Sequence, residues 1–338
     1  MNKFSWYEAK SVEDAIEQAN STVSEEIYTP TGKASIYKSG GIDVWDMVKE
    51  GLIAPQMIVN VRNIKGLDKM SFDPDSGLSI GANITLTEIE QSPEVNEHYT
   101  ALQQAVAHAA TPQLRNMSTL AGNLAQRTRC WYFRSTDHPC MRKGGDRCYA
   151  RSQQTGQNEN HAILDNGSCV SLHASSVATA LLAYEASVVY RDAKGESHEV
   201  PIEDFFVSPS QDIWRENILS PGDLITEIKV PTPSSGTRSH YVKQVARESY
   251  DWSLADVAVV AKMNGNKCEK ITIALGAAAP TPVRAYRAEE ALINQVINKE
   301  SAKLAGETAM ASARPLTMNG YKVPLFLATI SQALLEIA

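Results

Sequence analysis

No apolar run in this sequence approaches the ~18–20 residues that a helix needs to cross a bilayer, which argues against a membrane-spanning protein. The seven histidines show no HExxH spacing, and no serine or cysteine hydrolase signature is present, so these hydrolytic chemistries are not indicated. Acidic residues (39) outnumber lysine and arginine (32), which gives a formal net charge of −7. Because nucleic-acid binding needs a basic face, this balance argues against such a partner.

Cysteine is scarce as well, and its distribution is the most informative feature of the chain. Four of the five cysteines lie within forty residues, and Cys268 stands alone. The clustered ones are Cys130, Cys140, Cys148 and Cys169. Residues 127–151 also hold seven lysines and arginines against two aspartates. Four thiolates in an arginine-rich segment suit an anionic iron–sulfur cluster.

Zinc and disulfides are the alternatives. The spacings C-x9-C, x7-C and x20-C lack the close cysteine pair of a structural zinc site. Disulfides need an oxidising compartment, and the first ten residues lack the apolar region of a secretory signal. This start predicts a cytoplasmic protein, with export alongside a partner left open. Cluster ligation has no fixed spacing, so the pattern favours iron–sulfur without excluding the other two.

The length of 338 residues predicts about two domains at roughly 150 residues each. The first sixty residues alternate helix and strand, and a second α+β unit follows. Four strands are expected at hairpin-like spacing in 224–230, 241–245, 255–263 and 270–275, and three helices in 283–296, 300–312 and 325–336. We therefore expect a first domain over 1–222 and a second over 223–338. The first would comprise subdomains of about 1–60 and 61–222, with a long loop at 126–169 that we call the cysteine loop.

Two glycine motifs could hold a phosphate-bearing cofactor. One is Lys38-Ser-Gly-Gly-Ile-Asp43, and the other is Thr119-Leu-Ala-Gly-Asn123. Glycine lets the backbone approach a pyrophosphate with its N–H groups turned inward. Neither motif is GxGxxG or a Walker loop, so each taken alone also fits an ordinary tight turn.

The order of several motifs resembles the FAD-binding (medium) subunits of molybdenum hydroxylases of the xanthine dehydrogenase and aldehyde oxidoreductase type. Residues 39–49 resemble their AGGTDLLxLMK segment, 81–88 their IGAxTTLTE segment, and 111–124 their SPQIRNxATIGGNL segment. The arginine-rich cysteine loop resembles an inserted [4Fe-4S] loop of one branch of these subunits. Residues 243–252 and 275–280 fit their C-terminal domain.

This resemblance implies an α+β fold: a vanillyl-alcohol-oxidase (PCMH)-type FAD-binding domain of two subdomains, then a smaller α/β C-terminal domain. It implies FAD and a [4Fe-4S] cluster as cofactors, the cluster held by the four clustered cysteines. It implies as partners a molybdenum-cofactor large subunit and a [2Fe-2S] small subunit, with no nucleic acid and no membrane. The implied FAD-binding residues are Tyr37, Lys38, Ser39, Gly40, Gly41, Ile42, Asp43, Val44, Thr119, Leu120, Ala121, Gly122, Asn123, Ser176, Ile225 and Lys243.

Two residues depart from the family pattern. Ile42 replaces a threonine after the two glycines, and Ser176 replaces an aspartate near the flavin. The resemblance implies an electron-transfer subunit with no catalytic residue for substrate. The alternatives are an iron–sulfur scaffold with a weakened or lost flavin site, the beta subunit of a 4-hydroxybenzoyl-CoA-reductase-like enzyme, and a self-contained flavin oxidase. The sequence names neither substrate nor final acceptor.

Overall fold

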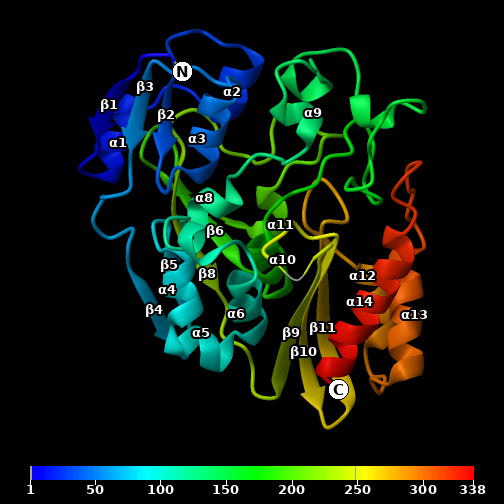
Figure 1. The fold of residues 1–338 in the computed structure, drawn as a ribbon. Helices are drawn as coiled ribbons and strands as arrows, with labels where there is room; N and C mark the ends of the chain where they lie inside the picture. The colour runs from blue at the N-terminus through cyan, green and yellow to red at the C-terminus, as the bar shows by residue number, and fades with distance from the viewer. Residues whose placement is uncertain (1, 248) are drawn as a thin grey trace.

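The computed structural model describes residues 2–247 and 249–338, and its chain forms three units, each built on one sheet (Figure 1). Met1 lies outside the described residues, as does Glu248 in the 243–252 motif. No helix in the described residues is both long and apolar enough to pass through a bilayer.

The first unit is a three-stranded parallel sheet in the order β1-β3-β2 with helices beside it. Thr22 caps the second helix with a reciprocal Thr22–Glu25 capping box, which satisfies N–H groups at its start. Its elements are β1 (Ser5–Glu8), α1 (Val12–Gln18), α2 (Val23–Tyr28), β2 (Ser35–Lys38), α3 (Ile42–Lys49) and β3 (Met57–Asn60).

The second unit is a five-stranded antiparallel sheet in the order β4-β5-β8-β6-β7. Its core is formed by the sheet and by apolar faces of α4, α6 and α10. Its strands are β4 (Met70–Asp73), β5 (Gly77–Gly81), β6 (Ser187–Arg191), β7 (Ser197–Pro201) and β8 (Leu224–Val230). Its helices are α4 (Leu86–Gln91), α5 (Pro93–His98), α6 (Thr100–Ala107), α7 (Pro112–Arg115), α8 (Leu120–Leu124), α10 (Ser176–Ala183) and α11 (Ile202–Phe205).

The third unit is a four-stranded antiparallel sheet in the order β12-β11-β10-β9. Successive residues of a strand point to opposite faces. Accordingly, Ala258 and Ala274 join the core of the second unit, whereas Val259 and Ile273 pack against the C-terminal helices. Its elements are β9 (Thr237–Gln244), β10 (Ala255–Asn264), β11 (Lys267–Gly276), β12 (Val283–Arg284), α12 (Tyr286–Leu292), α13 (Lys299–Met310) and α14 (Lys322–Glu336).

Two expectations differ from this architecture. The strand at 224–230 was expected to open the C-terminal domain, but it lies between β5 and β6 in the sheet of the second unit, so the boundary at 222 is too early. The helix expected over 283–296 begins at Tyr286, because Val283 and Arg284 pair with β11. In both cases strand pairing decides the outcome, between distant residues for β8 and between near neighbours for β12.

The cysteine loop packs against all three units. Its only regular structure in the described residues is α9 (Trp131–Arg134) and two 3₁₀ turns, η1 (Met141–Lys143) and η2 (Tyr149–Arg151). Phe133 and Cys140 join the core of the first unit. Asn319 Nδ2 donates to the His161 carbonyl at 3.0 Å, which fixes the far part of the loop to the C-terminal unit. The loop therefore lies where the three units meet.

Candidate functional site

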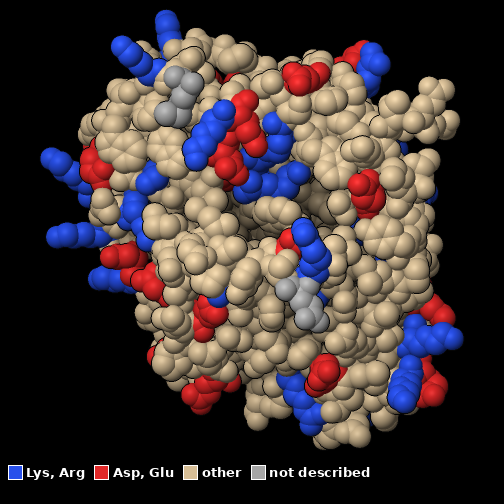
Figure 2. Space-filling view, in the orientation of Figure 1, with Lys and Arg blue, Asp and Glu red and all other residues tan. Residues whose placement is uncertain are grey.

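A cavity of about 440 Å³ opens on the face of the molecule shown in Figure 2. This is within the size range of pockets that hold small molecules and cofactors. Its wall is formed by the β2–α3 turn, by α8 with its preceding turn, by residues 217–225 and by Trp252 of the C-terminal unit. In Figure 2 the hollow lies below a group of basic and acidic side chains near the centre of the face.

Nearly all of the predicted flavin residues line this cavity. They are Tyr37, Lys38, Ser39, Gly40, Gly41, Ile42, Asp43, Val44, Thr119, Ala121, Gly122, Asn123, Ser176 and Ile225. Leu120 does not line the cavity, because it is fully buried in the core of the second unit. Lys243 lies away from it on β9, where its Nζ donates to the His108 carbonyl at 2.7 Å.

The first glycine motif closely approaches the backbone just before the second motif. A Cβ on Gly40 would lie 2.2 Å from the Met117 carbonyl oxygen, so no larger residue fits there without moving the backbone. Gly41 caps α3 with φ +83°, a left-handed conformation that favours glycine. The turn thus leaves backbone N–H groups at the start of α3 beside the cavity, an arrangement that favours a bound anion.

Asp43 was predicted to bind the cofactor, but its carboxylate already accepts several hydrogen bonds from the cysteine loop. The backbone N–H of Arg127 donates to it at 2.8 Å, and Nη2 of Arg134 donates at 2.6 Å. Arg129 pairs with it at 2.9 Å. Asp43 therefore fixes the start of the cysteine loop to α3, although it also lines the cavity.

Motif reasoning missed several other residues of the cavity wall. Arg127 and Arg129 line it, although the sequence placed them with the cysteines. The Arg129 guanidinium lies 5.0 Å from the ring centroid of Trp252, whose side chain is half exposed. No motif marks Arg127, but the excess of arginines over acidic residues near residue 127 indicates a site that binds an anion.

The four clustered cysteines converge around a second, smaller cavity. Cys130, Cys140, Cys148 and Cys169 all line it, together with the side chain of Arg142. Its free volume is about 20 Å³, so the surrounding side chains must turn outward to admit a group larger than a water molecule. Cys268 is remote from it and fully buried in the C-terminal core.

The state and spacing of the thiols bear on the choice between a disulfide, a zinc site and an iron–sulfur cluster. All five cysteines are free thiols. In the described part of the chain, no three of the clustered sulfur atoms lie within 4.8 Å of one another. Ligands of one tetrahedral zinc ion with Zn–S bonds of about 2.3 Å would lie about 3.8 Å apart. In a four-iron cluster each thiolate binds its own iron, which requires the wider spacing.

Burial favours the protonated form of three of the clustered thiols when no metal is bound. It raises the pKa of Cys130 to about 12, and it also raises the pKa of Cys140 and Cys148. A coordinated metal deprotonates a thiol outright. Burial opposes the charge of Arg142, but Glu216 and Cys169 outweigh that effect and raise the pKa of Arg142. The side chains present therefore fit an anionic metal–sulfur group.

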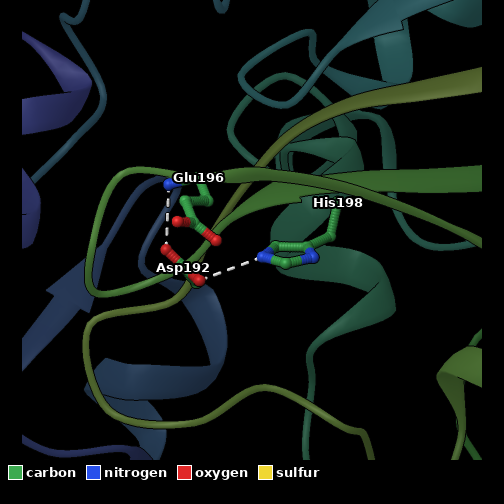
Figure 3. Close-up of side chains that lie close together, drawn as sticks. All are labelled: Asp192, Glu196 and His198. Carbon is green, nitrogen blue, oxygen red and sulfur yellow. Dashed lines mark hydrogen bonds and ion pairs between the residues drawn. The ribbon is translucent and has the colours of Figure 1, made fainter.

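A third group of possible metal ligands has a structural explanation. Asp192, Glu196 and His198 lie close together at the β6–β7 turn (Figure 3). The Asp192 carboxylate accepts from the backbone N–H groups of Lys194 and Glu196 and from His198 Nε2, each at 2.9 Å. These contacts close the hairpin, so the group needs no ion.

Comparison with known families identifies the fold and its cofactor. Residues 2–233 match the FAD binding domain in molybdopterin dehydrogenase, and residues 240–337 match the CO dehydrogenase flavoprotein C-terminal domain. This chain belongs to the FAD-binding subunits of the molybdenum hydroxylases. It is an oxidoreductase subunit that binds FAD and transfers electrons. The match of the first domain extends past β8, in agreement with the sheet that contains this strand.

Curated relatives support the assignment over most of the chain. The aldehyde oxidoreductase FAD-binding subunit PaoB of Escherichia coli (strain K12) is 32% identical over 300 residues, covering 88% of this chain and 90% of that protein. The carbon monoxide dehydrogenase medium chain of Hydrogenophaga pseudoflava is 24% identical, covering 93% and 88%.

Solved structures share the fold. Carbon monoxide dehydrogenase from Hydrogenophaga pseudoflava matches with a TM-score of 0.72 at 23% identity, covering 98% of this chain and 96% of that one. Quinoline 2-oxidoreductase from Pseudomonas putida 86 matches with a TM-score of 0.73 at 20% identity, covering 99% and 97%. The predicted fold, two α+β subdomains followed by a smaller domain, is confirmed.

Proposed function

We propose that this chain is the electron-transferring subunit of a heteromeric molybdenum hydroxylase of the aldehyde oxidoreductase type. Its partners would be a molybdenum-cofactor large subunit, where substrate is oxidised, and a [2Fe-2S] small subunit. The observation that carries this proposal is that a cofactor-sized cavity and a ring of four cysteines lie in one chain, bridged by buried arginines. The 32% identity to an aldehyde oxidoreductase subunit favours an aldehyde substrate for the complex over a purine.

The flavin would lie in the larger cavity, with its pyrophosphate beside Gly40 and Gly41 and beside the turn at Thr119–Asn123. Backbone N–H groups at the start of α3 would bind the phosphates, and Arg127 would add a positive charge. When bound, FAD supplies electron transfer in single or paired steps. Ile225 and Ser176, both buried in the wall, would lie beside the ring system.

The departures at Ile42 and Ser176 leave the flavin cavity open. Both side chains line the cavity, whose volume of about 440 Å³ is not filled by protein. Ser176 Oγ lies 3.4 Å from Ser253 Oγ, so the hydroxyl that replaces the family's aspartate has a polar partner. These observations support flavin binding over a scaffold that has lost its flavin site.

The smaller cavity would hold a [4Fe-4S] cluster on Cys130, Cys140, Cys148 and Cys169. Such a cluster supplies one-electron transfer. Its support is the convergence of the four thiols on one cavity and the adjacent Arg142. The chain's residues would bind and position the two cofactors and keep water from the cluster.

The proposal is tested on anaerobically purified full-length chain, alone and co-expressed with the two partner subunits. The chain alone should contain FAD and about four irons. Dithionite should bleach its flavin absorbance, yet it should oxidise neither aldehydes nor purines. Co-expression should yield a three-chain complex that turns over an aldehyde. Turnover by the isolated chain, or a colourless protein without FAD, would contradict the proposal.

A further inference from the structure

A buried row of three charged side chains joins the two cavities. Arg127 lines the larger cavity, and Arg142 lines the smaller one. Glu216 lies between them: Arg142 Nη1 donates to Glu216 Oε1 at 2.9 Å, and Arg127 Nε lies 2.6 Å from Glu216 Oε2. The exposed fractions of these side chains are 3% for Arg127, 9% for Glu216 and 2% for Arg142.

The row is not electrically balanced. Within the row two guanidinium groups share one carboxylate, and the further carboxylate that acts on Arg127, that of Asp43, also pairs with Arg129 and Arg134. Burying a charge is unfavourable unless an opposite charge lies nearby. The remaining contacts indicate where the compensating anions belong. Arg142 Nε donates to the sulfur of Cys169 at 3.3 Å. Nη2 of Arg127 is buried without a hydrogen-bond partner among the described residues.

We propose that Glu216 is a positioning residue that holds one arginine toward each cofactor, and that Arg142 raises the reduction potential of a cluster bound through Cys169. This inference rests on the proposed function, because it takes Cys169 as a ligand of the cluster. It adds a role for Glu216, a residue that belongs to neither the glycine motifs nor the cysteine set.

The expected direction follows from charge. Uptake of one electron makes the cluster more negative and changes no covalent bond; the electron comes from the partner iron–sulfur subunit in the complex and from dithionite in the test. Hydrogen bonds to the sulfurs and nearby positive charge stabilise the reduced state and raise the potential. The effect is strong because few water molecules screen the 2%-exposed Arg142 side chain. Glu216 and the Arg215 carbonyl hold the guanidinium at 2.9 and 3.4 Å, which fixes its Nε toward Cys169.

The test is a dithionite titration of the full-length chain followed by electron paramagnetic resonance, with iron content measured on the same sample. Arg142→Met removes the charge and the donor but keeps an unbranched apolar stem. At a fixed potential near the midpoint, its ratio of reduced to oxidised cluster should fall about tenfold, equivalent to about 59 mV for one electron. Glu216→Gln removes the negative charge while its amide oxygen still accepts from Arg142, so the ratio should rise.

Arg147→Met is the matched control. Arg147 belongs to the same loop and precedes Cys148, but its side chain is 66% exposed and pairs with Asp146, so its charge is screened by water. The reduction potential of the cluster in Arg147→Met should equal that in the unchanged protein. If the row had only a structural role, the cluster potentials of Arg142→Met and Glu216→Gln would shift in the same direction, or only their iron content would fall.

The outcomes separate this inference from the proposed function. If the unchanged protein contains no iron, both the proposed cluster and this inference are contradicted. Iron present, with the potential of Arg142→Met unchanged, would overturn this inference alone. If Arg142→Met fails to assemble a cluster, Glu216→Gln still tests the inference. A cluster potential in Glu216→Gln that is lower than or equal to that of the unchanged protein would contradict it.

Discussion

The carboxylate of Asp43 accepts a hydrogen bond at 2.8 Å from the backbone N–H of Arg127, 84 residues further along the chain. This contact joins the first turn of α3, next to the glycine pair, to the beginning of the cysteine loop. The loop that carries the cysteines and the turn that borders the larger cavity are thus parts of one polar network.

Asp43→Ala should release the cysteine loop from α3. The Arg134 guanidinium would lose its closest carboxylate while its side chain is only 9% exposed, and removal of one partner from such a pair costs about 3 kcal/mol. The midpoint of urea unfolding should fall, and hydrogen exchange of the Arg127 N–H should accelerate. Asp146→Ala is the control, because its carboxylate is 76% exposed and its pair with Arg147 is worth less than about 1 kcal/mol. Equal effects of the two changes would contradict this role for Asp43.

Gly40→Ala should abolish FAD binding. The new methyl group would lie 2.2 Å from the Met117 carbonyl oxygen and force apart the two turns that border the cavity. Gly41→Ala should have a smaller effect, since its methyl group would displace the side chains of Lys38 and Trp45 rather than backbone, and its left-handed conformation costs about 1–2 kcal/mol. FAD released by heat and measured by fluorescence gives the content per chain. Gly320→Ala, where a methyl group meets no atom within 4 Å, should keep normal FAD.

Cys148→Ala should lose most of the bound iron, because a four-iron cluster requires four thiolates. Cys268→Ala should keep it, since that thiol lies on β11 in the core of the C-terminal unit. Metal analysis of anaerobically purified protein, with zinc measured beside iron, checks both variants. Stoichiometric zinc in place of iron would refute cluster ligation, and equal iron in the two variants would refute the choice of cysteines.

Stability should rise with pH because of Lys322. Burial lowers the pKa of its ammonium group to about 7 in the folded chain, against about 10.4 in an unfolded one. Between these values the unfolded chain binds more protons at this position, so the free energy of unfolding increases with pH, by at most about 1.4 kcal/mol per unit. Urea unfolding at pH 7 and pH 8 should show a larger rise in the unchanged protein than in Lys322→Met; at higher pH the buried thiols, whose pKa values burial raises, oppose the rise. Lys303→Met, at a position 77% exposed, should retain it.

Much of the fold could be predicted from local patterns. The strand expected at 224–230 has those bounds in the structure. The sheet to which β8 belongs could not be predicted, because Leu78 pairs with Val230 across more than 150 residues and no local pattern records a partner. The residues of the candidate site likewise divide into those that a local motif predicts and those that only folding brings together. Both glycine turns and the cysteines were visible as motifs, whereas Glu216 is a single acidic residue in an irregular segment until folding brings Arg127 and Arg142 to it.

The cysteine loop also bears on the order in which the chain can fold. Its Asn158 and His161 make hydrogen bonds with residues 317–322, about 160 positions away, while its start binds α3 more than 80 positions back. Contacts between such distant residues close late, since each requires a large loss of chain entropy beforehand. The sheets of the first and third units can form from nearer neighbours, but the docking of these units requires the contacts of this loop. The rate of reaching the native state should therefore depend on the loop far more than its small share of regular structure suggests.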